Sequence, residues 1–524
     1  ADAARIARSP PVPSPPPNIL LIMADQLAAP ALPDYGHPVV QAPHIGALAA
    51  QGVLFEQAYC NSPLCAPSRC SMMAGRLPSR IGAYDNASEF PAAVPTVAHG
   101  LRAAGYRTCL AGKMHFVGPD QLHGFEERLT TDVYPSDFGW TPNWDAPEER
   151  IDWWYHNMLS VKQAGVAAAS NQQDFDDEVG FRAQRFLADH PRSADRRPFF
   201  LTVSFTHPHD PYAIRQRYWD RYAAVEIDPP RVPPIPPERL DAHSRRLVRV
   251  SAMEEIEITP DDVRRARRAY YGAISYLDDW VGRLVASLGE FGLADDTVVL
   301  FTSDHGDLLG ERGLWYKMCF FEWAVRVPLI VSAPGRFAHR RVATPVSLVD
   351  LLPTLLELAG TSDIAAIEPD GASLLPALEG RDPGERTVLG EYLAEGALAP
   401  IFMIRRGVWK FVGSEPDPPL LYDLERDPLE LENLAARPEH AATLSAFEAE
   451  VHSRWEPACL RATILTSQRA RRLAFGALMT GRHTAWDYQP PRDAAREYMR
   501  NHLDLNEVER RRRFPPPDGA PSPD

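Results

Sequence analysis

The stretch NILLIM at residues 18–23 decides the fold, because it is uninterrupted in apolar character after its first residue. Such a run is typical of a strand buried on both faces of a parallel sheet. Similar runs follow at residues 108–111, 199–205 and 297–302, and helical periodicity lies between them, most clearly over residues 260–291. The alternation predicts an α/β fold, with a large and mainly parallel sheet flanked by helices.

Polar, titratable side chains follow each of the four apolar runs directly. They are Asp25 and Gln26; Lys113 and His115; His207, His209 and Asp210; and Asp304, His305 and Asp307. Ligands of open α/β sheets bind beyond the carboxyl ends of the strands. Any one of these clusters is equally compatible with a solvated turn, but four clusters at one edge of a sheet predict an active site.

The bulk composition excludes several classes of partner. A formal charge of −15 over 524 residues argues against nucleic acid and anionic membranes, although a local cationic pocket could still receive an anion. No apolar run reaches the length of about 18 residues that a transmembrane helix needs, and the N-terminus lacks an apolar stretch of signal-peptide type. We therefore expect a cytoplasmic protein, and its six cysteines do not resemble a disulfide framework.

The amino-acid composition and pattern of the chain change at three positions. Residues 1–17 are rich in proline and are expected to be disordered, and residues 18–384 hold the expected catalytic domain. Residues 385–484 are expected to form a smaller C-terminal α/β subdomain. Residues 485–524 are polar and rich in arginine, and we expect an extended C-terminal tail.

The stretch CAPSR at residues 65–69 carries the strongest chemical signal. Pro67 suits the first turn of a helix, so Cys65 would lie at a helix N-terminus, where an anion is favoured and a thiol pKa is lowered. Cys60 and Cys70 leave a metal cluster or a disulfide open as alternatives, but five-residue spacing does not match the close pairs of zinc sites.

CAPSR followed by Gly75 resembles the signature of the sulfatases, although Met73 and Ala74 depart from the residues usual before that glycine. The resemblance implies an alkaline-phosphatase-like fold. It also implies that Cys65 is oxidised to formylglycine by a formylglycine-generating or maturase enzyme. The hydrated aldehyde of formylglycine is the nucleophile in this family, and Arg69 would hold it.

Other motifs extend the resemblance over nearly the whole chain. They are GKMH at 112–115, TSDHGD at 302–307, Lys317, and LYDL at 421–424. The resemblance implies one divalent metal ion held by Asp25, Cys65, Asp304 and His305. Carboxylates suit Ca²⁺ best, with Mn²⁺ or Mg²⁺ as alternatives.

The catalytic side chains follow from the chemistry of a sulfate ester. Lys113 and Lys317 would neutralise sulfate oxygens. His207, with help from Lys317, would act as the general acid for an alcohol leaving group, and His115 as the later base. The alternative for each histidine is a hydrogen-bonded core residue.

Gln26 and His305 stand where many sulfatases carry Asp and Asn, which is similar to the branch of choline sulfatases and phosphonate monoester hydrolases. The choline sulfatases in particular are similar at AYDN (83–86), GPDQLHGF (118–125), WYHNM (154–158) and THPHDPY (206–212). This resemblance implies hydrolysis of choline-O-sulfate to choline and sulfate.

A quaternary ammonium is held by aromatic faces and a carboxylate. We expect Trp140 and His156 to form this box, with Asp504 completing it from the next subunit of a homo-oligomer, a dimer or a tetramer. Ordinary core packing and a solvated tail are the alternatives. Phosphonate monoester or phosphodiester hydrolysis and arylsulfatase activity on the same scaffold remain possible functions. A non-catalytic protein that binds choline or sulfate is disfavoured, because binding needs neither a nucleophile nor an acid.

Overall fold

The computed structural model describes residues 16–361, 367–493 and 504–515. The expected disorder of residues 1–17 falls almost wholly outside these ranges, as does part of the expected tail at 485–524. In the described ranges, no helix combines the length and the apolar character needed to cross a membrane. The proposed divisions at 384/385 and 484/485 stay predictions.

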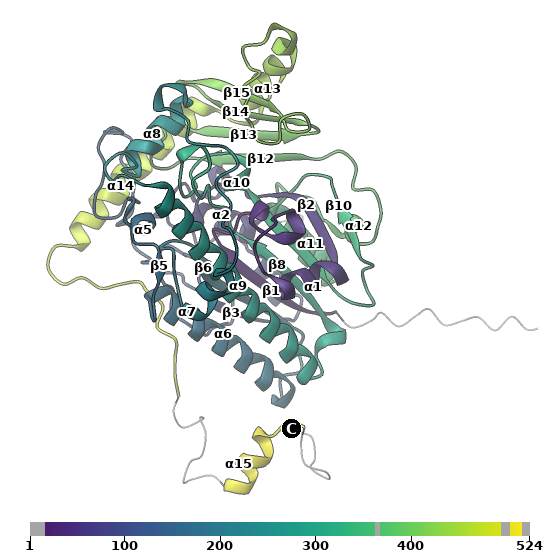
Figure 1. The fold of residues 1–524 in the computed structure, drawn as a ribbon. Helices are drawn as coiled ribbons and strands as arrows, with labels where there is room; N and C mark the ends of the chain where they lie inside the picture. The colour runs from purple at the N-terminus through teal and green to yellow at the C-terminus, as the bar shows by residue number, and fades with distance from the viewer. Residues whose placement is uncertain (1–15, 362–366, 494–503, 516–524) are drawn as a thin grey trace, which may run out of the picture.

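A nine-stranded sheet forms the centre of the molecule (Figure 1). Its strands are β1 (Asn18–Asp25), β2 (Val53–Tyr59), β3 (Arg107–Gly112), β4 (Glu127–Arg128), β6 (Phe199–Pro208), β8 (Thr297–Ser303), β9 (Arg326–Ser332), β10 (Arg340–Val342) and β11 (Val346–Ser347). Their order is β10-β2-β9-β8-β1-β6-β3-β4, and β11 pairs with β2. The four apolar runs of the sequence become β8, β1, β6 and β3, which are adjacent and parallel, as predicted.

One strand departs from the parallel direction. β9 runs antiparallel to both β8 and β2, so the sheet is mixed although its central strands are parallel. The predicted α/β class, with a large sheet between helices, is confirmed.

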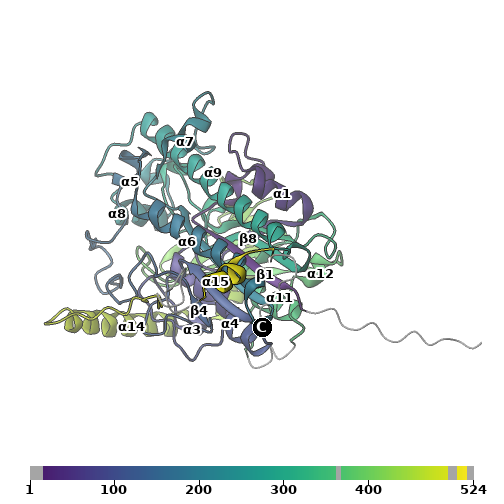
Figure 2. The same ribbon diagram turned by 90° about the horizontal axis from the view of Figure 1, so that it is seen from below.

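Helices cover both faces of this sheet. The helices of this part of the chain are α1 (Pro43–Gln51), α2 (Cys65–Ala74), α3 (Pro78–Ile81), α4 (Val97–Ala103), α5 (Leu159–Lys162), α6 (Asn171–Asp189), α7 (Gln216–Trp219), α8 (Ala242–Val250), α9 (Pro260–Glu290), α10 (Glu322–Val325), α11 (Leu351–Leu358) and α12 (Leu375–Leu378). Figure 2 shows α1, α6 and α9 on one face and α4 and α11 on the other. The short strands β5 (Gly165–Val166) and β7 (Ala213–Ile214) pair beside α9.

The longest helix, α9, begins where the sequence signals it. Thr259 accepts a hydrogen bond from the backbone of Asp262, and the Asp262 carboxylate accepts one from the backbone of Thr259, which forms a capping box ahead of Pro260. Gly180 lets α6 lie directly on α9, because a Cβ there would come within 2.4 Å of the Trp280 ring.

A second, antiparallel sheet follows in the chain. It contains β12 (Thr387–Tyr392), β13 (Ile401–Arg406), β14 (Trp409–Ser414) and β15 (Asp417–Asp423), and it is followed by α13 (Ala441–Arg454), α14 (Pro457–Leu478) and α15 (Leu505–Arg512). Phe402, Phe411, Phe447 and Trp455 pack in a small core between this sheet and its helices.

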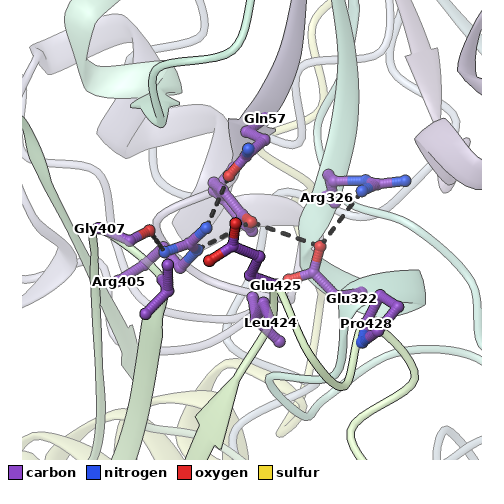
Figure 3. A pocket seen from close by; sticks show the side chains of 10 residues that line it. Gln57, Glu322, Arg326, Arg405, Gly407, Leu424, Glu425 and Pro428 are labelled. Atoms are coloured by element: carbon purple, nitrogen blue, oxygen red, sulfur yellow. Dashed lines mark hydrogen bonds and ion pairs between the residues drawn. The ribbon is translucent and has the colours of Figure 1, made fainter.

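Buried charges join the two sheets. Lys410 of β14 is fully buried and contacts Glu322 at 2.9 Å and Glu430 at 2.6 Å. Beside them, Arg405 of β13 donates to Gln57 of β2 at 2.6 Å, at the edge of a cavity of about 300 Å³ (Figure 3). Removal of one partner from such a buried pair would leave an uncompensated charge, so this junction fixes how the sheets sit together.

Candidate active site

The carboxyl ends of the central strands bring the predicted residues together. Asp25 ends β1, His207 lies near the end of β6, and Asp304 and His305 follow β8 directly. Lys113 follows β3. All five residues are at most 1% exposed.

Gly112 makes the turn after β3 possible. Its φ of 108° is in the left-handed region, and a Cβ there would lie only 1.9 Å from the carbonyl oxygen of Ser204. The chain can therefore turn sharply and carry Lys113 and His115 towards Cys65.

Cys65 is the first residue of α2, as the sequence predicts. Its Sγ lies 3.1 Å from Nε2 of His305 and 3.9 Å from Oδ1 of Asp25. Burial alone would raise the pKa of the Cys65 thiol, but the positive charges of Lys113, Lys317 and His305, with a contact from His115, hold that pKa well below its ordinary value. Cys60 and Cys70, by contrast, have thiol pKa values raised by burial, and all six cysteines are free. Cys65 is therefore the chemically distinct cysteine.

Arg69 contacts both carboxylates of the site, those of Asp25 and Asp304. Asp25 contacts Lys113 and lies 3.5 Å from Arg69, while Asp304 accepts a hydrogen bond from Nε of Arg69 at 2.7 Å. Burial tends to raise the pKa of Asp25, but the positive charges of Lys113, His209 and Arg69 together outweigh it, and the pKa lies below its usual value.

These residues fit a divalent ion. One ligand atom each from Asp25, Cys65, Asp304 and His305 lies within 4.8 Å of the others. Two carboxylates and an imidazole, fully buried and this close, could share a single ion at ligand distances of about 2.0–2.6 Å.

His207 has a partner that the sequence analysis missed. Its Nδ1 lies 2.6 Å from Oδ2 of Asp176, and that carboxylate also accepts the backbone N–H groups of Thr206 and His207. Nε2 of His207 is buried and has no hydrogen-bond partner in the described parts of the chain. An ionised Asp176 makes Nδ1 the donor, which leaves Nε2 free to act on a ligand.

His115 and Lys317 both lie close enough to Cys65 to lower the pKa of its thiol. The His115 ring packs against Tyr134 and Trp140, with centroids 5.2 and 5.7 Å away. Lys317 donates to Oε1 of Gln26 at 2.5 Å and lies 2.8 Å from Nε2 of His209.

A cavity of about 60 Å³ opens beside Cys65. Its lining includes Cys65, Asn86, Tyr134, Trp140, Trp154, Tyr155, His156, His209, Lys317 and Glu395. Trp140 and His156 are thus in the cavity where the sequence analysis expected a box. Trp140 and Trp154 are stacked at 6.2 Å.

Glu395 is the acid of this cavity, and sequence reasoning missed it. It is 4% exposed, its Oε2 has no hydrogen-bond partner within the described ranges, and burial raises its pKa to about 7. It follows β12 in a segment with no motif, so only the fold could reveal it. Asp504 is exposed and accepts a hydrogen bond from the backbone of Glu507 at the start of α15. In space, α15 lies far from α2, the helix that begins with Cys65 (Figure 1). Its expected place in a neighbouring subunit stays a prediction.

Comparison with known proteins gives the family. The family model "Sulfatase" matches residues 17–361. The chain belongs to the sulfatase family. Two further models match this sulfatase: "Choline sulfatase enzyme C terminal" over residues 462–514 and "N-sulphoglucosamine sulphohydrolase, C-terminal" over residues 310–456.

Individual relatives agree. The sulfatase is 50% identical over 507 residues to a choline-sulfatase of Rhizobium meliloti (strain 1021), an alignment that covers 95% of this chain and 98% of the relative. It is 30% identical to the iduronate 2-sulfatase of Mus musculus, over 66% of this chain and 68% of that protein. The crystal structure of a phosphonate monoester hydrolase of Agrobacterium radiobacter is similar with a TM-score of 0.67 and 26% identity, over 86% of this chain and 96% of the other.

Proposed function

We propose that this sulfatase hydrolyses choline-O-sulfate to choline and sulfate. The observation that carries the proposal is the buried Glu395 together with Trp140 in the cavity that opens on Cys65. A quaternary ammonium donates no hydrogen bond, so aromatic faces and a carboxylate are the groups that recognise it. The similarity to the choline-sulfatase of Rhizobium meliloti and to the choline sulfatase C-terminal family supports the same substrate.

We assign the metal ion to Asp25, Asp304, His305 and residue 65, and we propose Ca²⁺ because two of these ligands are carboxylates. Sulfatases generally use a formylglycine and a divalent metal. Together the two groups would supply the nucleophile and a positive charge against the sulfate oxygens. A formylglycine-generating or maturase enzyme would convert Cys65, and Arg69 would orient the converted residue.

Lys113 and Lys317 complete the positive charge around the sulfate. Both are buried, and the charges of Cys65, Asp210 and Asp25 outweigh the effect of burial and raise the pKa of Lys317, so that it stays protonated. Each can neutralise a sulfate oxygen in an environment that excludes water.

The histidines divide the proton transfers. His207, oriented by Asp176, would donate a proton from Nε2 to the departing choline oxygen, because an alkoxide leaves poorly without one. His115 would accept a proton from residue 65 later in the cycle; the contribution of His115 to the lowered pKa of the Cys65 thiol supports this role.

We also propose a homo-oligomer in which Asp504 of one subunit faces the ammonium bound by another. Trp140 and His156 then contribute aromatic faces, and Glu395 and Asp504 contribute the two negative charges. The supporting observations are that Asp504 is exposed at the start of α15 and that α15 lies far below α2 in Figure 1.

The test compares substrates on the purified full chain. Mass spectrometry of the peptide that contains Cys65 first measures its conversion. The value of kcat/KM is then determined for choline sulfate, 4-nitrophenyl sulfate and an aryl phosphonate monoester. The proposal expects choline sulfate to be preferred. A preference for the phosphonate ester or the aryl sulfate would favour the corresponding hydrolase instead, and no turnover by fully converted protein would favour a binding protein.

A further inference from the structure

We infer that helix α14 sets substrate specificity, with Arg471 as the positioning residue that ties this helix to the leaving-group side of the cavity. The inference rests on the proposed choline sulfatase function and assigns a role to a segment outside the catalytic strands.

Arg471 makes a buried, two-point ion pair with Asp85. Nη1 and Nη2 of Arg471 lie 2.7 Å from Oδ1 and Oδ2 of Asp85, and the side chains are 7% and 0% exposed. Nη1 also donates to the hydroxyl of Thr141 at 3.1 Å. A paired, planar contact of this kind fixes orientation as well as distance.

Asp85 and Thr141, which Arg471 contacts, are each next in the sequence to a residue that lines the cavity. Asp85 comes directly before Asn86, whose Oδ1 accepts the backbone N–H of Ala66 at 3.0 Å, next to Cys65. Thr141 comes directly after Trp140. One guanidinium therefore holds two wall segments of the cavity.

Two more polar contacts from the same region reach the same walls. Oε1 of Gln468, one turn before Arg471, accepts the backbone N–H of Trp144 at 2.9 Å, and the Trp144 indole donates to the carbonyl of Ala394, next to Glu395. Asp487, beyond the end of α14, accepts both the backbone N–H and the hydroxyl of Ser136, two residues after Tyr134.

The buried face of α14 is unusually polar. Its buried residues are Pro457, Ile464, Gln468 and Arg471, so two of the four are polar, while Leu473 is 77% exposed. Apolar packing alone would bury leucine rather than glutamine and arginine. The polar contacts to the cavity walls account for this choice.

The contacts made by α14 and Asp487 reach the walls of the leaving-group cavity but not the groups proposed to act on sulfate. Arg471, Gln468 and Asp487 have no hydrogen bond or ion pair to Cys65, to the metal cluster or to His207 within the described chain. Loss of Arg471 should therefore disturb how the choline group is held, and leave attack on sulfur largely intact.

The experiment measures kcat and KM of Arg471→Gln in the full chain, on choline sulfate and on 4-nitrophenyl sulfate. Misplacing a positioning group can cost up to about a hundredfold, and we expect KM for choline sulfate to rise about tenfold or more. KM and kcat for the aryl sulfate should change less than about threefold, since it carries no quaternary ammonium whose position depends on these walls.

Arg469→Gln is the matched control. Arg469 lies on the same helix and pairs with Asp145, but the two side chains are 63% and 42% exposed, and such a surface pair contributes little. Arg471→Lys keeps the charge but loses the two-point geometry, so its KM should lie between those of the wild type and Arg471→Gln.

Gln468→Met covers the case in which Arg471→Gln does not fold, because it is neutral and similar in volume. It should raise KM for choline sulfate alone. A folded Arg471→Gln or Gln468→Met protein with unchanged KM for choline sulfate, or with equal losses on both substrates, would overturn the inference while the proposed function stands. A converted wild type that hydrolyses aryl sulfate but not choline sulfate would overturn both.

Discussion

Asp176→Asn is the sharpest test of how the leaving group departs. The change keeps the shape of the side chain and removes the negative charge 2.6 Å from Nδ1 of His207. A hydrogen bond to a charged partner contributes about 1.5–3 kcal/mol, and each 1.4 kcal/mol is about a tenfold change. We therefore expect kcat for choline sulfate to fall by about 10- to 150-fold near neutral pH. This loss lies below or at the lower end of the range of about 10²–10⁴ that a general acid contributes in total, because the acid itself stays in place.

The effect should depend on the substrate. The Asp176 carboxylate contacts Nδ1 of His207 and orients the ring, so its loss weakens proton transfer from Nε2 to the departing alkoxide. For 4-nitrophenyl sulfate, whose phenolate departs unaided, kcat should change less than about threefold.

The measurement is steady-state kinetics on both substrates, with thermal unfolding as a check of folding. Asp174→Asn is the control, because Asp174 is an exposed acid in the first turn of the same helix. Equal losses on the alkyl and the aryl ester, or an unchanged kcat for choline sulfate in a folded Asp176→Asn protein, would refute the assignment of His207 as an acid oriented by Asp176.

Three other predictions concern the metal, the ammonium site and the tail. Asp25→Ala and Asp304→Ala should each lower both the bound metal measured by elemental analysis and the activity; unchanged metal content in both variants would remove these residues from the metal site. Because burial raises the pKa of Glu395 to about 7, the carboxylate is lost as the pH falls through that value, so KM for choline sulfate should rise below about pH 7. Glu395→Gln should have a high KM that is independent of pH, and a pH-dependent KM in that variant would exclude Glu395 as the source. Truncation before residue 492, which removes Asp504, should raise KM for choline sulfate and lower the assembled mass on a sizing column; a truncated protein with normal values of both would reject the shared site.

The sequence could predict the sheet and the strand-end residues because both are local patterns. Uninterrupted apolar runs such as residues 18–23 can be buried on both faces only in the middle of a sheet, and the parallel neighbours β8, β1, β6 and β3 follow from that. The acids and bases that follow these runs then meet at one edge of the sheet. The antiparallel β9 was not foreseen, because the sequence analysis identified only the four runs that became β1, β3, β6 and β8.

Other parts of the candidate site had no local signal. Asp176 lies in the first half of α6, where an acid is ordinary, and only packing against β6 brings it to His207. Glu395 follows a strand of the second sheet, 330 residues after Cys65, and becomes special only because the fold buries it in the same cavity. Arg471 reads as one of several arginines on a helix until its burial against Asp85 is known.

The residues proposed to act on sulfate and the residues around the leaving-group cavity come from different parts of the chain. The groups proposed to act on sulfate come from strand ends, from α2 and, for Lys317, from the loop before α10. All of them belong to the segment matched by the general sulfatase family. The groups that surround the leaving-group cavity come from loops, and α14 and the residues beyond it, in the segment matched by the choline sulfatase C-terminal family, hold those loops. Rigid strand ends can fix a metal and a nucleophile within the narrow tolerances that catalysis needs. Loops held by a separate helix can change with the substrate without moving those groups. An overall charge of −15 is compatible with an anionic substrate, because the local field matters more than the net charge. Arg69, Lys113 and Lys317 make that field positive where the sulfate would bind.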